Sequence, residues 1–215
     1  FRHGSAERTT TMSIFDIDKR DVEFALFDHA GLDELLETEK YSDYSLELFE
    51  MVLGQAQKFA AERLAPSNQE VDREGVRLED GQVYVPEAYE EVYDDFCEGG
   101  WVAPSHSVEY GGQGLPAALS LSTFEMFIAA NSSFSFFSGL AASAGHLIET
   151  FATEELKEAY VENLYTGEWT GTMCLTEPQA GSSVGDLKTS AEPVEVEDYF
   201  HITGNKIFIS QGDHQ

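Results

Sequence analysis

The chain changes from helical to strand-like sequence near residue 168, and this change limits the folds available to it. Before that point, apolar residues recur at spacings of three and four, as on one face of an α-helix. After it, β-branched and aromatic residues alternate with polar ones, as in a half-buried strand. The order predicts an α+β protein, with an all-α N-terminal helical bundle followed by the start of a β domain.

The first part of the chain contains one clear amphipathic helix. It is predicted at Leu46–Leu64, with Ser42 or Asp43 as its N-cap and Pro66 as its stop. The apolar residues of Ile14–Lys40 have no clean period, which predicts an extended arm followed by a short helix.

Proline and glycine mark the later helices. Pro86 opens one helix after a predicted loop or hairpin at Val71–Val85. Pro116 opens another, whose apolar residues leave no polar face, so we expect it to be buried on nearly all sides. A last helix, Glu154–Tyr165, should end at Gly167.

Three segments after residue 168 are typical of strands. They are Trp169–Thr176, Tyr199–Thr203 and Lys206–Ser210, and Gly204-Asn205 supplies a two-residue hairpin turn between the last two. The acidic segment Glu192–Asp198 is expected to be a solvated loop.

These elements divide the chain into four parts. Two or three strands cannot close a barrel or cover their own edges, so we expect the sequence to belong to a longer protein. The predicted parts are a cloning remnant at 1–11 before a plausible start at Met12, an N-terminal arm at 12–41, a helical domain at 42–167 and an incomplete middle β domain at 168–215.

The charge balance excludes several partners. The 215 residues hold 12 Lys and Arg against 40 Asp and Glu, a formal net charge of −28. Such a surface cannot neutralise a row of phosphates, which argues against nucleic acid and against anionic membranes. Dense carboxylates also suit a protein from a salty habitat, although a merely acidic surface is the alternative.

Cysteine and histidine usage favours a cytoplasmic protein without a metal. Cys97 and Cys174 lie far apart without CxxC spacing, as in a reducing compartment. None of the six histidines pairs with another at metal-ligand spacing. No apolar stretch has the roughly 20 residues of a membrane helix, and no signal peptide is recognisable at the start.

The segment Met173–Ser183 is the most informative for chemistry. A predicted strand ends there, Pro178 turns the chain, and Gly181-Ser182-Ser183 exposes N–H groups and hydroxyls that could hold a phosphate or a polar ring edge. By composition alone, an ordinary β-turn with small polar residues is the better explanation of this segment.

Several motifs together resemble acyl-CoA dehydrogenases. Thr172–Ser183 and Ile202–Ser210 are similar to the two flavin-contacting signatures of that family. Upstream of them, four further motifs stand in the family's order: Gly99–Pro104, Glu109–Pro116, Phe151–Tyr160 and Thr166–Trp169. The long N-terminal arm, Gly-Gly-Gln-Gly-Leu-Pro and Phe-Ile-Ser-Gln-Gly-Asp-His further resemble the large-subunit branch, which includes 3-methylmercaptopropionyl-CoA dehydrogenases.

The resemblance implies a helical N-terminal domain, a middle β-barrel and a C-terminal helical domain that this chain does not contain. FAD would lie between the last two domains and at a subunit interface. Carried over by position, the FAD-contacting residues would be Met173, Leu175, Thr176, Gly181, Ser182, Phe208, Ile209 and Ser210, and Ser182 would also face the CoA phosphates. Phe208 stands where the family usually has Trp, Ser210 where it has Thr, and Ser183 where it has Asp.

The implied reaction is α,β-dehydrogenation of an acyl-CoA thioester. A carboxylate removes the α-proton while the β-hydrogen leaves as hydride to flavin N5, in a slot that excludes water. Phe134, Phe136 and Phe137 are candidates for a wall of that slot. The family's catalytic Glu would lie beyond Gln215, so no catalytic residue is assigned. The implied partners are an acyl-CoA substrate, an electron-transfer flavoprotein and further copies of the chain in a homodimer or homotetramer.

Three alternatives stay open at this point. The same fold occurs in acyl-CoA oxidases, which reduce O₂ directly, and in flavoproteins of the alkylation-response type. A third possibility is a non-catalytic helical interaction module in which the strand motifs are remnants, and this one predicts that even the full-length protein lacks flavin.

Overall fold

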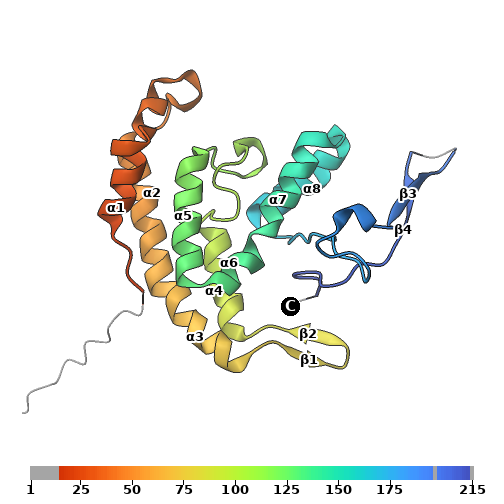
Figure 1. Ribbon diagram of the computed structural model, residues 1–215. Helices are drawn as coiled ribbons and strands as arrows, with labels where there is room; N and C mark the ends of the chain where they lie inside the picture. Colours follow the sequence, from red (N-terminus) through yellow and green to blue (C-terminus); the bar gives the residue numbers. More distant parts are fainter. Residues whose placement is uncertain (1–14, 196–197, 214–215) are drawn as a thin grey trace, which may run out of the picture. The chain divides into compact units, whose positions relative to one another are not determined.

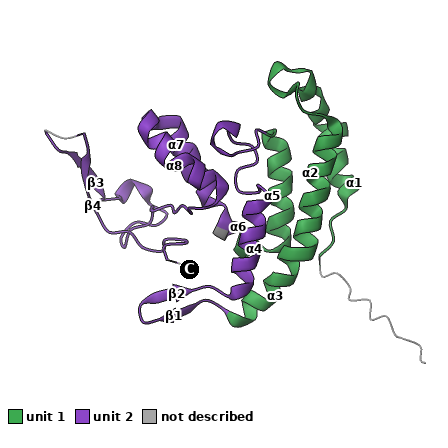
Figure 2. Ribbon diagram, turned by 180° about the vertical axis from the view of Figure 1, so that it is seen from behind, with its two compact units in different colours: residues 1–74, 115–135 green, residues 75–114, 136–215 purple. Residues whose placement is uncertain are grey.

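The computed structural model describes residues 15–195 and 198–213, and its elements follow one another as drawn in Figure 1. The predicted cloning remnant at 1–11 lies outside the described residues. The chain forms two compact units, each built from two stretches of sequence (Figure 2). One combines the described residues through Glu74 with Leu115–Ser135, and the other combines Gly75–Gly114 with the described residues from Phe136 onward. The division into a helical and a β domain at residue 168 stays a prediction.

The first unit begins with short helical turns, so from Lys19 onward the predicted arm is helical and not extended. α1 (Lys19–Glu23) starts where the Asp18 carboxylate accepts a hydrogen bond from Arg20 N at 3.0 Å. A π-helix follows at Phe24–His29, and 3₁₀ turns follow at Leu32–Glu37 and Glu39–Tyr41. Because π and 3₁₀ turns have more and fewer residues per turn than an α-helix, their buried residues lack a 3.6-residue period.

The predicted amphipathic helix forms, but both of its predicted ends are wrong. α2 (Leu46–Phe59) is capped by Ser45, whose hydroxyl accepts from Leu48 N at 3.2 Å. A π-helical turn at Ala60–Leu64 joins α2 to α3 (Ala65–Glu74), so the chain stays helical through Pro66. The wider turn ends where the proline ring would clash with an ordinary helical carbonyl, which is how a π-bulge accommodates a proline.

α5 (Ala117–Ala130) packs on α2 within this unit, and its start after Pro116 confirms the prediction. The rings of Phe59 and Phe127 meet edge to face, with centroids 5.7 Å apart. The expectation that α5 is buried on nearly all sides is wrong, because Leu121 is 67% exposed.

A buried polar network closes the first unit at the start of α6 (Ser132–Ser138). Asn131 Oδ1 accepts from Phe134 N at 3.0 Å, which caps this helix. Asn131 Nδ2 donates to Ser67 Oγ at 3.1 Å and to Leu64 O at 3.4 Å. The network therefore joins the segment after α5 to the π turn and α3, which are more than 60 residues away in sequence.

Two helices of the second unit begin or end where the sequence predicts. α4 (Glu87–Glu98) starts after Pro86, and α8 (Glu154–Thr166) ends at Gly167, which has a φ of 84°. α7 (Leu140–Phe151) packs against α8. A Cβ on Gly145 of α7 would lie 2.6 Å from the Tyr165 ring, so a close helix approach explains the small residue there.

The strands of the second unit form two hairpins. β1 (Arg77–Glu79) pairs with β2 (Gln82–Tyr84), which confirms the first predicted hairpin, although the helix α3 takes up the beginning of its predicted range. β3 (Ser190–Pro193) pairs with β4 (Phe200–Thr203) in antiparallel fashion. Single 3₁₀ turns lie at Val108–Tyr110 and Val184–Asp186.

Two of the three strands predicted after residue 168 are not strands in this structure. Trp169–Thr176 and Lys206–Ser210 have no strand assignment, and Gly204-Asn205 does not form a hairpin turn between two strands. β4 pairs instead with β3, which lies before it, in part of the segment predicted as an acidic loop. Strand propensity alone does not make a strand, because a strand also needs a ladder of backbone hydrogen bonds to a neighbour. Among the described residues these two segments share the backbone bond from Ile207 N to Thr176 O, which is no ladder.

Candidate functional site

The predicted turn at Pro178 exists and is tight. Glu177 and Ala180 form an isolated antiparallel bridge, in which each backbone N–H donates to the other's carbonyl at 3.0 Å. Ala180 and Glu177 are buried, whereas Pro178 and Gln179 face solvent. The turn therefore reverses the chain within the first of the two flavin-like signatures, Thr172–Ser183.

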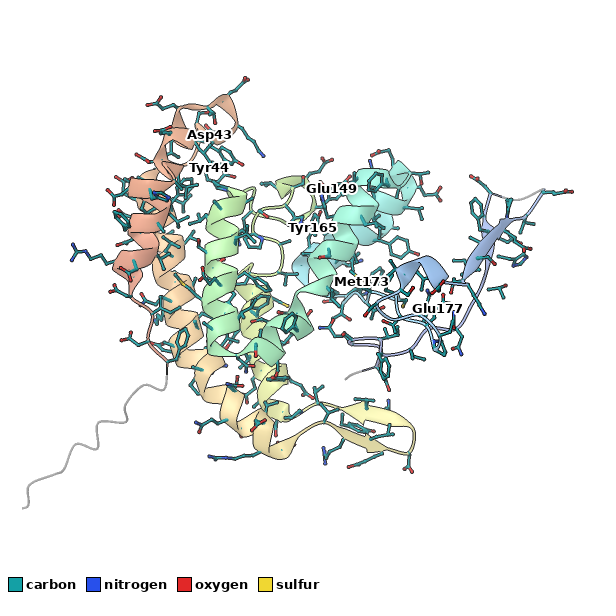
Figure 3. All side chains as sticks on the ribbon, in the orientation of Figure 1. Asp43, Tyr44, Glu149, Tyr165, Met173 and Glu177 are labelled. Atoms are coloured by element: carbon teal, nitrogen blue, oxygen red, sulfur yellow. The ribbon has the colours of Figure 1, made fainter. Side chains whose placement is uncertain are left out.

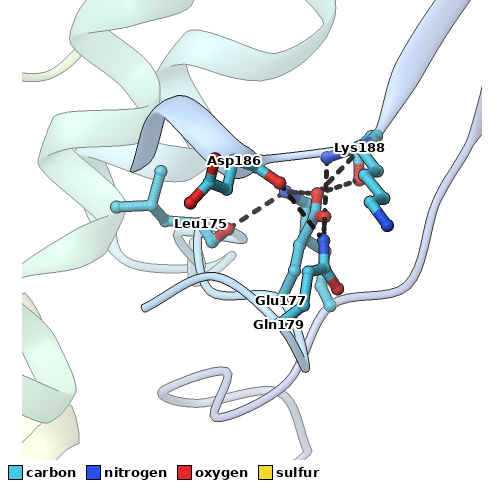
Figure 4. A network of polar contacts seen from close by, with 7 residues as sticks. Leu175, Glu177, Gln179, Asp186 and Lys188 are labelled. Atoms are coloured by element: carbon cyan, nitrogen blue, oxygen red, sulfur yellow. Dashed lines mark hydrogen bonds and ion pairs between the residues drawn. The ribbon is translucent and has the colours of Figure 1, made fainter. Parts of the chain in front are cut away.

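The carboxylate of Glu177 is the polar centre of this region (Figure 4). Oε1 accepts from Thr189 N at 3.0 Å, from Thr189 Oγ1 at 2.6 Å and from Lys206 Nζ at 2.8 Å. Oε2 accepts from Lys188 N at 2.8 Å and from Gln179 Nε2 at 2.6 Å. The Glu177 side chain is only 2% exposed, so these five donors replace the water that a buried carboxylate loses.

This environment favours the ionised carboxylate. Hydrogen bonds hold the pKa of Glu177 far below its usual range, and the largest contribution comes from the Lys206 ammonium, followed by the Thr189 hydroxyl. Glu177 is therefore a stable negative charge at neutral pH, and a proton acceptor role would require it to give up these bonds.

The network brings the two signature segments together. Lys206 Nζ donates to Leu175 O at 3.0 Å as well as to Glu177, and Ile207 N donates to Thr176 O at 2.9 Å. Leu175 and Thr176 belong to the first segment, whereas Lys206 and Ile207 belong to the second. Residues about 30 positions apart are thus fixed next to each other by hydrogen bonds.

The predicted cofactor-contacting residues differ in exposure. Met173 is 62% exposed and Phe208 is 87% exposed, while Thr176 and Ile209 are half-buried. Leu175, Gly181, Ser182 and Ser210 also face solvent, and a Cβ on Gly181 would meet no atom within 4 Å. Apolar side chains and backbone are therefore accessible along both segments.

The second segment carries unusual backbone geometry. Phe208 and Gln211 have φ angles of 57° and 58°, in the left-handed region that L-residues seldom adopt. The side-chain Oε1 of Gln211 is buried and accepts no hydrogen bond from the residues that the structure describes. Gln211 Nε2 donates to Phe136 O at 3.1 Å, which ties the segment to α6 within the second unit. Such strain clusters at ligand-binding sites.

Of the phenylalanines proposed as a wall of a substrate slot, Phe134 and Phe136 belong to different units, and the side chain of Phe137 lies outside the part that the structure describes. Phe134 is completely buried in the first unit, where it serves as core. Phe136 belongs to the second unit and is 68% exposed.

A second cluster of titratable side chains contains Glu149 of α7, Tyr165 of α8 and His106 of the loop that follows α4. Figure 3 labels Glu149 and Tyr165, whose hydroxyl donates to Glu149 Oε2. Burial first, and then this bond, raises the pKa of Tyr165. The His106 ring lies 4.7 Å from the Tyr165 ring and 5.4 Å from that of His146, between centroids, and burial lowers the pKa of His106.

Sequence reasoning missed the three residues that hold the site together, which are Glu177, Thr189 and Lys206. One signal was available for Lys206, because a chain with only 12 Lys and Arg seldom places one inside an alternating apolar segment. Nothing in the sequence indicated that Thr189 would meet Glu177, since their contact depends on the turn between them.

No group of three or more His, Cys, Asp or Glu residues that could hold a metal ion is found within 15–195 and 198–213. In the same part of the chain, every helix is too short or too polar to cross a membrane.

The comparison with protein families decides the relationship. The family model for the acyl-CoA dehydrogenase N-terminal domain matches residues 47–168. This chain belongs to the acyl-CoA dehydrogenase family. The resemblance seen in the motifs is therefore confirmed, and so is the predicted fold class, a helical N-terminal domain with a short β portion.

Named relatives agree with this assignment. The chain is 35% identical over 195 residues to 3-methylmercaptopropionyl-CoA dehydrogenase of Ruegeria pomeroyi, covering 91% of this chain and 33% of the relative. It is 35% identical over 199 residues to a butyryl-CoA dehydrogenase of Syntrophomonas wolfei, covering 91% and 32%. The crystal structure of an acyl-CoA dehydrogenase from Geobacillus kaustophilus superposes with a TM-score of 0.62 at 26% identity, over 77% of this chain and 40% of the other.

The chain thus spans about a third of the length of these curated relatives.

Proposed function

We propose that this chain is the N-terminal part of an FAD-dependent acyl-CoA dehydrogenase that introduces an α,β double bond into an acyl-CoA thioester. One observation carries the proposal: the two segments that resemble the family's flavin-contacting signatures are hydrogen-bonded side by side through Thr176–Ile207 and Leu175–Lys206. Acyl-CoA dehydrogenases are FAD-dependent oxidoreductases, and family membership supports the same cofactor here.

The residues of the two segments fit FAD. Exposed apolar side chains at Met173, Leu175 and Phe208 suit the faces of a planar ring, and the hydroxyls of Thr176 and Ser210 suit its polar edge. The left-handed backbone at Phe208 is the kind of strain that ligand sites contain. When bound, FAD would accept the two electrons and the β-hydrogen of the substrate.

In this proposal the chain binds and orients FAD and the acyl-CoA. A carboxylate removes the α-proton, and no residue of this chain is assigned to that role. The FAD contacts would be Met173, Leu175, Thr176, Gly181, Ser182, Phe208, Ile209 and Ser210. Ser182, exposed beside open space at Gly181, would also donate to a CoA phosphate.

Partners and location belong to the same proposal. An electron-transfer flavoprotein would reoxidise the cofactor, and the chain would assemble as a homodimer or homotetramer in the cytoplasm. The free thiols of Cys97 and Cys174 support a reducing compartment.

The test is an anaerobic visible absorption spectrum of the full-length protein that contains this chain, recorded before and after addition of butyryl-CoA. We expect a bound flavin whose visible band bleaches. A protein that cannot be loaded with FAD would refute the proposal and favour the non-catalytic module. Rapid O₂ consumption during turnover, without any electron-transfer flavoprotein, would favour an oxidase of the same fold.

A further inference from the structure

Glu177 lies at the junction of three segments that are separate in sequence. Its own segment contains Leu175 and Thr176, the second contains Lys188 and Thr189 just before β3, and the third contains Lys206 just after β4. All five hydrogen bonds to its carboxylate come from these segments or from its own turn.

We propose that Glu177 is a positioning residue that fixes the two cofactor-contacting segments against each other. This inference rests on the proposed function, because it concerns how the same site holds FAD. Glu177 acts through Lys206, whose ammonium also holds the Leu175 carbonyl.

The geometry leaves the carboxylate no equivalent replacement. Oε1 faces three donors and Oε2 faces two, so both oxygens must accept hydrogen bonds. Glutamine has the same shape but carries an NH₂ group in place of one oxygen. In Glu177→Gln that group would oppose N–H donors, either Lys188 N and Gln179 or Thr189 and Lys206. The substitution therefore breaks the junction while it preserves volume.

The consequence for the cofactor follows from the backbone. The Leu175 carbonyl is held by Lys206, and the Thr176 carbonyl accepts from Ile207 N. If the ammonium of Lys206 loses its carboxylate, the first of these contacts loses its anchor. The peptide group that contains the Leu175 carbonyl is then held less firmly relative to Phe208 and Ser210, and preorganised binding of a rigid ring is weakened.

The experiment measures FAD affinity of the full-length protein after removal and re-addition of flavin. The variants are Glu177→Gln, Lys206→Met and the double variant, with Glu192→Gln as matched control because Glu192 lies exposed on β3. We expect each single variant to raise the Kd for FAD at least ten-fold. The double variant should be no more than two-fold weaker than the worse single variant, since both act on one junction.

A second readout separates positioning from stability. At saturating FAD, the visible bands of the flavin bound to Glu177→Gln should differ from those of the parent protein, because contacts at the ring edge have moved. A purely structural role would lower the thermal midpoint and leave these bands unchanged. Glu192→Gln should match the parent in both readouts.

Three results would overturn the inference. The first is a folded Glu177→Gln protein with a Kd within two-fold of the parent and unchanged bands, and the second is additive losses in the double variant. If Glu177→Gln does not fold, Thr189→Val decides, because it removes only the 2.6 Å hydroxyl bond. That variant should weaken FAD binding about three-fold, and an unchanged Kd is the third overturning result. A parent protein that binds no FAD refutes the proposed function itself and is recognised before any variant is compared.

Discussion

Asn131 offers a direct measure of how much a buried polar network contributes to the first unit. The residue is 1% exposed, and its side-chain amide both accepts and donates hydrogen bonds in the network. Oδ1 caps α6 through Phe134 N, and Nδ2 donates to Ser67 Oγ and to Leu64 O. Asn131→Ala removes all three hydrogen bonds at once and adds nothing that could replace them.

The expected cost follows from these contacts. Loss of an Asn N-cap costs about 1 kcal/mol. Loss of two buried side-chain hydrogen bonds, one of them long at 3.4 Å, adds about 1–2 kcal/mol. We therefore expect Asn131→Ala to lower the free energy of unfolding by about 2–3 kcal/mol, or the thermal midpoint by roughly 5–10 °C.

The assay is urea or thermal unfolding followed by circular dichroism at 222 nm. Ser133→Ala is the matched control, because Ser133 is exposed in the first turn of the same helix. We expect the control to change the free energy by less than about 0.5 kcal/mol. If Asn131→Ala costs less than about 1 kcal/mol, water or a shifted backbone satisfies Phe134 N, and the reasoning fails.

Three further predictions concern the second unit. The pKa of Glu177 is lower in the folded protein than its unfolded value near 4.5, so the ionised carboxylate should stabilise the fold above pH 4.5 and lose this effect as the pH falls below it. The difference in free energy of unfolding between the parent and Glu177→Gln, measured in urea, should therefore be smaller at pH 3.5 than at pH 7. Gly145→Val places atoms 2.6 Å from the Tyr165 ring and should cost about 1–3 kcal/mol in thermal unfolding. Burial raises the pKa of the Cys97 thiol to about 11, so at pH 8 a thiol reagent should label exposed Cys174 at least about ten-fold faster.

Each of these predictions has a control or a contradicting result. For Gly145, the control is Gly54→Ala in α2, where a Cβ meets nothing within 4 Å and the better helix former should stabilise by about 0.5–1 kcal/mol. For Glu177, a stability gap that widens on acidification would contradict the assigned sign. For the cysteines, equal labelling rates in folded protein would mean that Cys97 is not protected.

Some of the molecule follows from local sequence alone. Pro86 and Pro116 precede helices because a proline ring fits the start of a helix, and Gly167 ends α8 because its φ of 84° suits glycine. The Asp-Gly turn at Asp80-Gly81 makes the first hairpin for a similarly local reason. The motifs of the two flavin-like segments were also sufficient to predict the family.

The predictions from sequence were wrong where local structure depends on residues that are distant in the chain. Pro66 did not end its helix, because a π turn precedes it and Asn131, distant in sequence, donates to carbonyl and hydroxyl groups near it. The stretch Trp169–Thr176 has strand propensity, but a strand also requires a ladder of backbone hydrogen bonds to a neighbouring segment, and that ladder depends on the folded chain.

The candidate site divides in the same way. The sequence by itself determined which residue types could contact a flavin, since their order and spacing form recognisable motifs. Only the tertiary structure decided that Glu177 would be buried and would join Thr189 and Lys206 to its own turn. The physical reason is that a buried carboxylate needs several donors at once, and those donors come from segments that only the folded chain brings together.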